Sequence, residues 1–255
     1  MIPGFIDPSA NEQPRQAEFG LLAMTGIPCE FHDAVTYLDG VAQMEARQAA
    51  RRAGGAPDSV LYFEHEAVIT RGRATPPGHI LAEAAGVPVV EVPRGGMATW
   101  HGPGQLVGYP VIDLSRRAGG RAPDIHHYIR ALEDGLAAYL RARHDLGAFA
   151  RAGHTGVWVG EPASPRKIAS IGVSARRWVS GHGFALNVNP DLRAFRAIMP
   201  CGLDPAVMTS VERELRRARR STRLPAMRQV ARTVHVYVCE ALRAAGFAPT
   251  EDAAT

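Results

Sequence analysis

The chain has 255 residues, of which 46% are hydrophobic and 21% are charged. This is an ordinary composition for a globular protein that is large enough to bury a core. The sequence has no low-complexity tract, no internal repeat and no apolar run of about 18 residues, which excludes collagen-like, repeat and membrane-spanning classes. The net charge of +4 suits acidic partners without requiring nucleic acid, so we expect neither nucleic-acid nor membrane binding.

The first twenty residues lack both the basic start and the apolar stretch of a secretory signal. The three cysteines, Cys29, Cys201 and Cys239, are too few and too scattered for a disulfide framework, so we expect a cytoplasmic protein with free thiols. Of the 29 basic residues only Lys167 is a lysine. Because lysine can release its proton at accessible pH and arginine effectively cannot, this lone lysine is a candidate functional residue.

The chain pattern predicts an N-terminal arm over residues 1–30, one domain over 31–248 and a short tail over 249–255. Apolar periodicity and turn residues mark the elements of the domain. In chain order we expect a helix from about Asp33 to Ala53, strands at Ser59–Thr70, Val87–Pro93 and Gln105–Leu114, a helix starting after Pro123-Asp124, strands at Thr155–Val159, Ile168–Trp178 and Gly183–Asn189, and a helix from about Pro225 to Ala245.

Two local signals refine this order. A tight turn at Ser180-Gly181-His182 is expected between the last two strands, as in an antiparallel hairpin. Thr209, with Glu212 three residues later, is typical of a capping box at a helix start. Strands and helices are mixed without a regular strand-helix alternation, so we expect a single α+β domain built on a mixed or antiparallel sheet.

The densest unusual segment is the loop RGGMATWHGPGQ, residues 94–105, between two predicted strands. Its glycines let the backbone approach a ligand closely, while Arg94, Thr99, His101 and Gln105 supply polar side chains within one short stretch. The alternative is an elaborate turn with no ligand. Two glycine clusters that bracket these side chains exceed what a turn requires, and we favour a binding loop.

Three further segments carry chemistry. They are RKIASIG (166–172), which contains Lys167 and a glycine inside a strand, GHGFALN (181–187), and MPCGL (199–203). Cys201 lies between proline and glycine, where a reactive thiol is exposed more readily than inside a helix. A cysteine attacks as its thiolate, which a nearby cation or histidine must favour. Lys167, His101 and His182 all remain candidates for that role.

The other two cysteines are weaker nucleophile candidates. Cys239 lies in VHVYVCEALRAAG, which is most simply a buried helix face, and Cys29 lies in the arm. No HExxH or other metal-ligand spacing occurs among the histidines, and we expect no metal site. No phosphate-binding GxxxxGK[ST] loop, complete GxGxxG or GxSxG elbow is present either.

Taken together, these segments resemble the lipoyl(octanoyl) transferase family. RGGMATWHGPGQLVGYPVIDL is similar to the family's RGGxxT(aromatic)HGPGQLxxYP signature, and EHEAVITRGR (Glu64 to Arg73) is similar to its EHxxVxTxGR strand. KIASIG, GHGFALNV and PCGL follow in the family's order. The resemblance runs from about residue 33 to about 245 and implies a fold like the catalytic domains of biotin and lipoate protein ligases.

The resemblance implies an octanoyltransferase that needs no cofactor. It implies that Cys201 carries the acyl group as a thioester and that Lys167 lowers the pKa of its thiol. His182 is an additional candidate site residue. The residues that the resemblance implies for binding the acyl substrate are Arg94, Gly95, Gly96, Met97, Ala98, Thr99, Trp100, His101, Ser170, Ile171, Gly172, Gly183, Phe184 and Ala185.

The implied partners are octanoyl-acyl carrier protein as donor, and the lipoyl domains of 2-oxoacid dehydrogenases and the glycine cleavage H protein as acceptors. We expect a monomer. The arginines of residues 213–223 are either a docking surface for the acidic carrier or a solvated helix face. Three other functions remain open: an ATP-dependent lipoate or biotin ligase on the same scaffold, a noncatalytic acyl-carrier-binding module, and a cysteine hydrolase.

Overall fold

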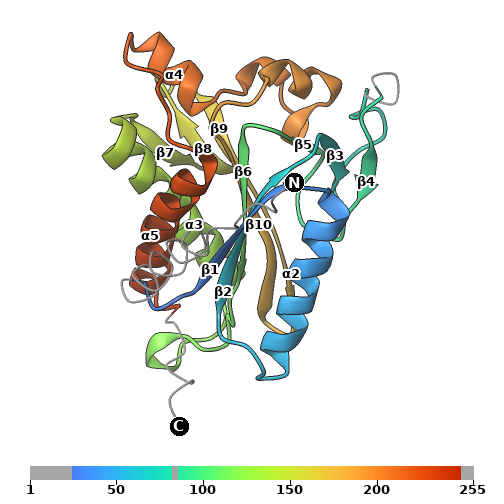
Figure 1. The fold of residues 1–255 in the computed structure, drawn as a ribbon, viewed down its shortest axis with the longest axis vertical. Helices are drawn as coiled ribbons and strands as arrows, with labels where there is room; N and C mark the ends of the chain where they lie inside the picture. Colours follow the sequence, from blue (N-terminus) through green and yellow to red (C-terminus); the bar gives the residue numbers. More distant parts are fainter. Residues whose placement is uncertain (1–24, 82–85, 248–255) are drawn as a thin grey trace, which may run out of the picture.

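The computed structural model describes residues 25–81 and 86–247, and a seven-stranded sheet forms the middle of this region (Figure 1). Only the first pair, β1 with β2, is parallel, and all other neighbours are antiparallel. The predicted α+β class with a mixed sheet is therefore confirmed. Across the sheet the order is β1 (Cys29–Val35), β2 (Ser59–His65), β6 (Gln105–Val111), β10 (Val179–Asn187), β9 (Arg166–Arg176), β8 (His154–Val159) and β7 (Ala148–Arg151).

Three long helices cover the two faces of this sheet. Helices α3 (Ile125–His144) and α5 (Met227–Ala244) pack together over one face, and α2 (Tyr37–Arg52) lies on the other (Figure 1). Both α3 and α5 match the expected helices. α3 starts where Asp124 accepts hydrogen bonds from the backbone N–H of the second and third helical residues. None of the helices within the described ranges is both long and apolar enough to cross a bilayer.

A second, three-stranded sheet lies beside the first and includes Thr99–His101 from the middle of the glycine-rich loop. Its order is β4 (Val89–Glu91), β3 (Val68–Arg71), β5 (Thr99–His101). Short 3-10 turns pack near β5 and lead into the seven-residue helix α4. In chain order these remaining elements are η3 (Ala118–Gly120), η4 (Leu192–Ala197), η5 (Pro200–Gly202), η6 (Pro205–Val207) and α4 (Val211–Arg217).

Two expected elements at the start of the domain are wrong in their boundaries. The helix expected from Asp33 begins only at Tyr37, because residues 29–35 form the edge strand β1 and Thr36 then caps the helix by accepting from the Asp39 N–H. The expected strand 59–70 is two strands in different sheets, separated at residues 66–67. A continuous apolar pattern does not reveal a change of sheet.

The expected hairpin is present, but its turn and the later helix cap are displaced. The turn is at Arg177 and Trp178, whose φ values of 49° and 63° suit a two-residue hairpin turn. Residues 180–182 instead pair with β9 inside the sheet. Helix α4 is capped by Ser210, which accepts from the Arg213 N–H, and not by Thr209. The arm and tail, apart from residues 25–30, lie outside the described residues.

Candidate active site

Arg94 fixes the start of the glycine-rich loop. Its guanidinium donates to the carbonyls of Gly95 and Met97, each at 3.0 Å, and to Thr70 Oγ1 at 2.7 Å. The side chain is only 7% exposed. Arg94 therefore binds the loop that contains it to strand β3, and this holds the backbone of residues 95–97 in one shape.

Glycines let the same loop lie directly on strand β9. The Gly95 N–H donates to the Val173 carbonyl at 3.1 Å. A Cβ on Gly172 would lie 3.1 Å from the Gly95 oxygen, closer than most side chains tolerate. The glycine inside the KIASIG strand thus permits the loop backbone to approach, which is the physical reason for a glycine at that position.

A cleft of about 420 Å³ opens where this loop, strand β9 and helix α3 meet. Ile125 and Ile129 contribute an apolar wall from α3, and Lys167 contributes a cation from β9. The sequence-predicted residues that line the cleft come from two separate motifs: Gly95, Gly96 and Met97, and Lys167, Ile171 and Gly172.

Lys167 is buried at the wall of this cleft and is 1% exposed. Its Nζ donates a 2.7 Å hydrogen bond to the Thr155 carbonyl and lies 5.3 Å from the centre of the Trp158 ring. A cation over an aromatic face is favourably placed. Strand β8 therefore supplies two contacts that hold the lysine side chain in a defined position.

The turn that contains Cys201 lies next to the cleft. η5 packs near β5, and a Cβ on Gly202 would be 3.4 Å from Met97 Sδ, an atom of a cleft-lining residue. The chain then returns to β9, where the Thr209 N–H donates to the Lys167 carbonyl at 2.9 Å. The Cys201 side chain lies outside the described part of the structure, and the position of Cys201 is given by the turn Pro200–Gly202 that contains it.

Buried hydrogen bonds join two of the sequence motifs to each other and to Thr209, which follows the Cys201 turn in the chain. Gln105 Nε2 donates to Asn187 Oδ1 at 2.9 Å, and Asn187 Nδ2 donates to the Thr209 carbonyl at 2.9 Å. Gln105 Oε1 is then left to accept from His101 Nδ1, at 2.7 Å, which places the imidazole proton on Nδ1. Side chains from the HGPGQ and GHGFALN motifs thus anchor the end of the cysteine-bearing segment.

A second, much smaller cavity of about 30 Å³ lies on the α2 side of the sheet. Burial lowers the pKa of His101 to about 3 and that of His182 to about 4, so both imidazoles are neutral at neutral pH. Neither histidine lines the cleft that Lys167 lines. The sequence-predicted residues that line the smaller cavity are Arg94, His101, Ser170, Gly172, His182, Gly183, Phe184 and Ala185.

Three predicted binding residues line neither cavity. Ala98 and Trp100 belong to the apolar cluster of the small sheet, where Trp100 packs edge-on against Phe195 with 5.6 Å between ring centres. Thr99 pairs with Thr70 in the same sheet. The positions of these three residues in the small sheet indicate that they support the glycine-rich loop. Within residues 25–81 and 86–247 no group of three His, Cys, Asp or Glu side chains is arranged to hold a metal ion.

Sequence reasoning missed one charged residue beside Lys167. Glu133 accepts a hydrogen bond from the Gly156 N–H at 2.8 Å and is 7% exposed. The sequence contains a signal for Glu133, because this residue lies four residues after Ile129 and three before Leu136, on the buried stripe of α3. An acidic residue on an apolar helix face requires a polar partner inside the protein.

The sequence is similar to curated octanoyltransferases. It is 45% identical to the octanoyltransferase of Mycobacterium ulcerans (strain Agy99) over 69% of this chain and 74% of the relative. It is 43% identical to that of Mycobacterium tuberculosis (strain H37Rv) over 78% and 80%. A third relative, the octanoyltransferase of Gloeobacter violaceus, is 44% identical over 67% and 72%.

The fold is similar to that of solved lipoate protein ligases. A structure described as lipoate-protein ligase A bound with ATP matches with a TM-score of 0.60 at 16% identity, over 84% of this chain and 85% of that one. A bipartite lipoate protein ligase from Thermoplasma acidophilum matches with a TM-score of 0.54 at 18% identity, over 84% of both chains. The family model described as the lipoyl protein ligase A/B catalytic domain matches residues 36–234, and the chain belongs to that family.

Proposed function

We propose that this protein is an octanoyltransferase that moves an octanoyl group from an acyl carrier protein to a lysine amine of a lipoyl domain. Relatives at 43–45% identity over most of the chain carry that name. The observation that carries the proposal is the convergence of separate motifs on one cleft. The loop of residues 95–97 and Lys167 line it, and the backbone of the Cys201 turn lies against it.

In the first half-reaction, the Cys201 thiolate attacks the thioester carbonyl of the donor. A new thioester forms on Cys201 as the old thioester breaks, and the carrier sulfur leaves as a thiol with a proton from the Lys167 ammonium, which becomes a neutral amine. The Lys167 ammonium favours the thiolate electrostatically. Because one thioester replaces another, the exchange is close to isoenergetic and requires no ATP. The neutral state of His101 and His182 supports the lysine over either histidine as the cation of this step.

In the second half-reaction, the neutral ε-amine of the acceptor lysine attacks the octanoyl thioester. An amide bond forms, Cys201 leaves as thiolate, and the amine proton passes to Lys167 as general base. The carbonyl oxygen needs hydrogen-bond donors as it gains charge. The N–H groups of Gly95 and Gly202 already donate to Val173 and Met199 in this structure. Either would have to release its acceptor before it could bind the oxyanion.

The test is intact-protein mass spectrometry of the enzyme mixed with octanoyl-acyl carrier protein without ATP, beside a Cys201→Ser control. We expect the octanoyl mass on the wild-type protein and not on the control, and its loss when a lipoyl domain is added and gains the same mass. Release of free octanoate instead would indicate a hydrolase.

The same experiment tests the ligase alternative. The likeness to lipoate protein ligases is at 16–18% identity and supports the scaffold alone. If no adduct forms and the acceptor is acylated only from free acid with ATP, the protein is a ligase and the proposal is wrong. If the protein binds the carrier with neither reaction, it is a binding module.

A further inference from the structure

One peptide group in strand β8 lies between two opposite charges. Lys167 Nζ donates to the Thr155 carbonyl at 2.7 Å, and the Gly156 N–H donates to Glu133 Oε1 at 2.8 Å. The Thr155 carbonyl and the Gly156 N–H belong to the same planar peptide bond. A single rigid unit therefore connects the carboxylate of α3 to the ammonium of β9.

The direction of this peptide dipole matches the two charges. Its N–H, the positive end, faces the carboxylate, and its carbonyl, the negative end, faces the ammonium. Hydrogen bonds to charged groups are stronger than those between neutral groups. Charges removed from water polarise such a chain of hydrogen bonds further. The carboxylate thus orients the carbonyl that holds Lys167 Nζ.

The backbone at this position strongly favours glycine. Gly156 has a φ of 123°, a conformation that residues with a Cβ rarely adopt. A Cβ there would also collide with the Ala169 carbonyl and lie 2.9 Å from Lys167 Cε. The close approach of the lysine stem to this peptide therefore depends on Gly156.

Burial of Glu133 disfavours its charged form, and its partners offset only part of this cost. Burial raises the pKa of the Glu133 carboxyl, and the nearby charge of Asp134 adds to this. The Gly156 hydrogen bond and the charges of Lys167 and Arg130 act in the opposite direction and favour the carboxylate. The charged groups that act on it are thus two residues of its own helix and the lysine of β9.

We propose that Glu133 is a positioning residue for Lys167, acting through the Thr155–Gly156 peptide. It holds the carbonyl that fixes the lysine Nζ, and its negative charge favours the ammonium in a site removed from water. The inference rests on the proposed function in one respect. It assumes that the position and charge of Lys167 matter for the reaction at Cys201.

The chain contains one lysine, which makes a direct test available. Protein labelled with lysine carrying ¹³C at Cε gives a single lysine resonance, and its chemical shift follows the charge of Lys167 with pH. Glu133→Gln keeps the size and the accepting oxygen while it removes the charge. Asp134→Asn makes the same charge change at the next, exposed residue and is the matched control.

We expect Glu133→Gln to move the midpoint of this titration to lower pH by about one unit, and Asp134→Asn to move it by less than about 0.3 unit. The kcat for acylation of Cys201, the step that uses the ammonium, should fall by up to about tenfold, the factor that corresponds to one pKa unit, without a change in KM for the carrier. Glu133→Asp, which restores the charge, should recover part of both effects. Equal midpoints for the wild type and Glu133→Gln would overturn the proposal.

A second measurement needs no variant and covers the case in which Glu133→Gln does not fold. In the wild type, the Gly156 amide resonance should shift as Glu133 titrates at acid pH, and the lysine resonance should shift with the same midpoint. If only the amide shifts, the coupling is absent and the proposal is wrong. A shifted lysine titration in an enzyme that forms no acyl adduct would refute the proposed function and leave the positioning intact.

Discussion

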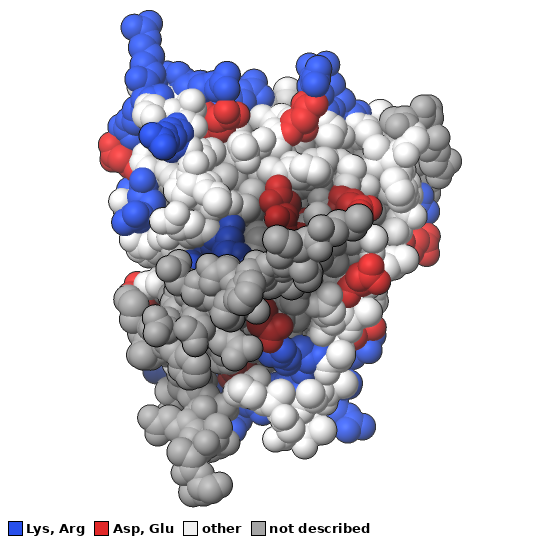
Figure 2. Space-filling model, viewed as in Figure 1, with Lys and Arg blue, Asp and Glu red and all other residues white. Residues whose placement is uncertain are grey.

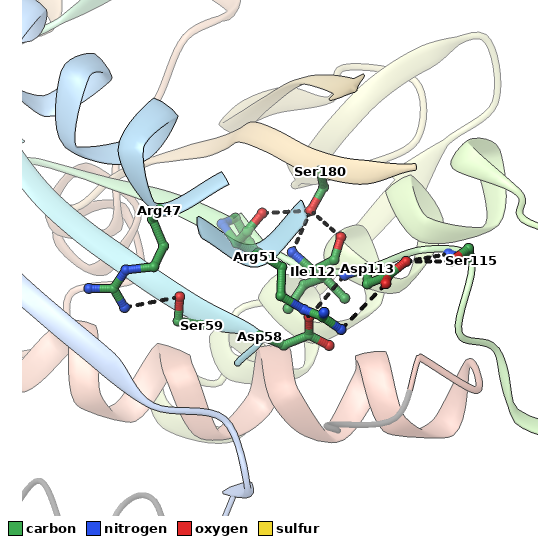
Figure 3. Close-up of polar contacts among 9 residues, drawn as sticks. Arg47, Arg51, Asp58, Ser59, Ile112, Asp113, Ser115 and Ser180 are labelled. Atoms are coloured by element: carbon green, nitrogen blue, oxygen red, sulfur yellow. Dashed lines mark hydrogen bonds and ion pairs between the residues drawn. The ribbon is translucent and has the colours of Figure 1, made fainter. Parts of the chain in front are cut away.

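The seven-stranded sheet buries charged side chains in different ways at the two ends of strand β9. At the end where β9 finishes, Arg51 of α2 donates to Asp58 Oδ1 at 2.6 Å and approaches Asp113 Oδ2 at 3.4 Å (Figure 3). Ser180 satisfies the neighbouring backbone by accepting from the Ile112 N–H. The cation and its counter-ions are in direct contact, and the cluster joins the end of α2 to β2 and β6.

At the end where β9 starts, the partners of Lys167 include a backbone carbonyl and an aromatic face, and the carboxylate of Glu133 acts on it across a peptide bond. The first arrangement uses charge to fix the fold. The second leaves the lysine beside a cleft, where its charge and its proton are available for chemistry. This difference is what distinguishes a structural ion pair from a candidate catalytic cation, although both are buried.

The largest expected effect comes from replacing the lysine. Lys167→Arg keeps the positive charge but does not give up a proton near neutral pH, so we expect transfer to the acceptor amine to fall at least about 100-fold. Enzyme acylation should fall less than transfer. Single-turnover measurements of the two steps, with Lys167→Met as the variant lacking charge, provide the comparison. Transfer at the full rate would exclude proton transfer by this residue.

At the opposite end, Asp58→Asn should reduce stability while leaving the chemistry intact. Burial raises the pKa of Asp58, against the opposing effect of the Arg51 hydrogen bond. Removing the carboxylate leaves the Arg51 guanidinium buried beside Asp113 alone, and we expect the free energy of unfolding to fall by about 3 kcal/mol. Urea denaturation measures this, with the exposed Glu66→Gln as control. An equally large loss in both variants would contradict it.

Between the two ends, the buried histidines should make the fold sensitive to acid. Burial lowers the pKa of His65 to about 4, as it does for His182, and that of His101 to about 3. Below pH 6.5 the unfolded chain binds protons that the folded chain does not. Stability should therefore fall as pH decreases from about 6.5 towards 4, by up to about 1.4 kcal/mol per pH unit for each histidine.

The measurement is chemical denaturation at a series of pH values between 7 and 4. His65→Gln should reduce the steepness of the fall, because one group that titrates only in the unfolded chain has been removed. The exposed His126→Gln is the matched control and should leave the slope unchanged. A slope that is the same in all three proteins would show that burial of His65 does not couple folding to pH.

The smallest effect is expected at the surface of α4. Figure 2 shows basic side chains over this helix with acidic ones beside them. Arg216 pairs with Glu212 at 2.8 Å, and Arg217 lies 3.7 Å from Glu214. Reversing both arginines to glutamate should raise the KM for the carrier protein by less than about tenfold, and only at low salt. The charge reversal Arg52→Glu on α2 is the control, and an equal effect there would exclude docking at α4.

The long helices and strands with a periodic apolar pattern could be predicted from the sequence. The positions of turns between them could not be predicted. Helix α3 follows from its apolar stripe, with Asp124 as its N-cap, because packing and capping act on the same residues. The hairpin turn at Arg177 and Trp178 has no glycine. Its position follows from the pairing of residues 180–182 with β9, a tertiary effect that overrides turn propensity.

The candidate site shows the same division. The lone lysine and the two glycine-bearing motifs could be identified from residue type alone, because each is unusual in its sequence context. The sequence could not show that these residues line two separate cavities, because that depends on the face of β9 to which each side chain points. Glu133 could have been identified as an acidic residue on the apolar stripe of α3, but its partner could not, because no sequence pattern marks the backbone N–H of another element.

The burial of Lys167 has one more consequence. An enzyme that holds an acyl group as a thioester and delivers it to lysine amines can also acylate its own lysines and those of neighbouring copies. The only ε-amine of this chain is 1% exposed, so the folded protein offers solvent no lysine acceptor. On the proposed mechanism, two acylated copies that meet therefore find no surface lysine to modify, because the composition and the burial of Lys167 together remove that acceptor.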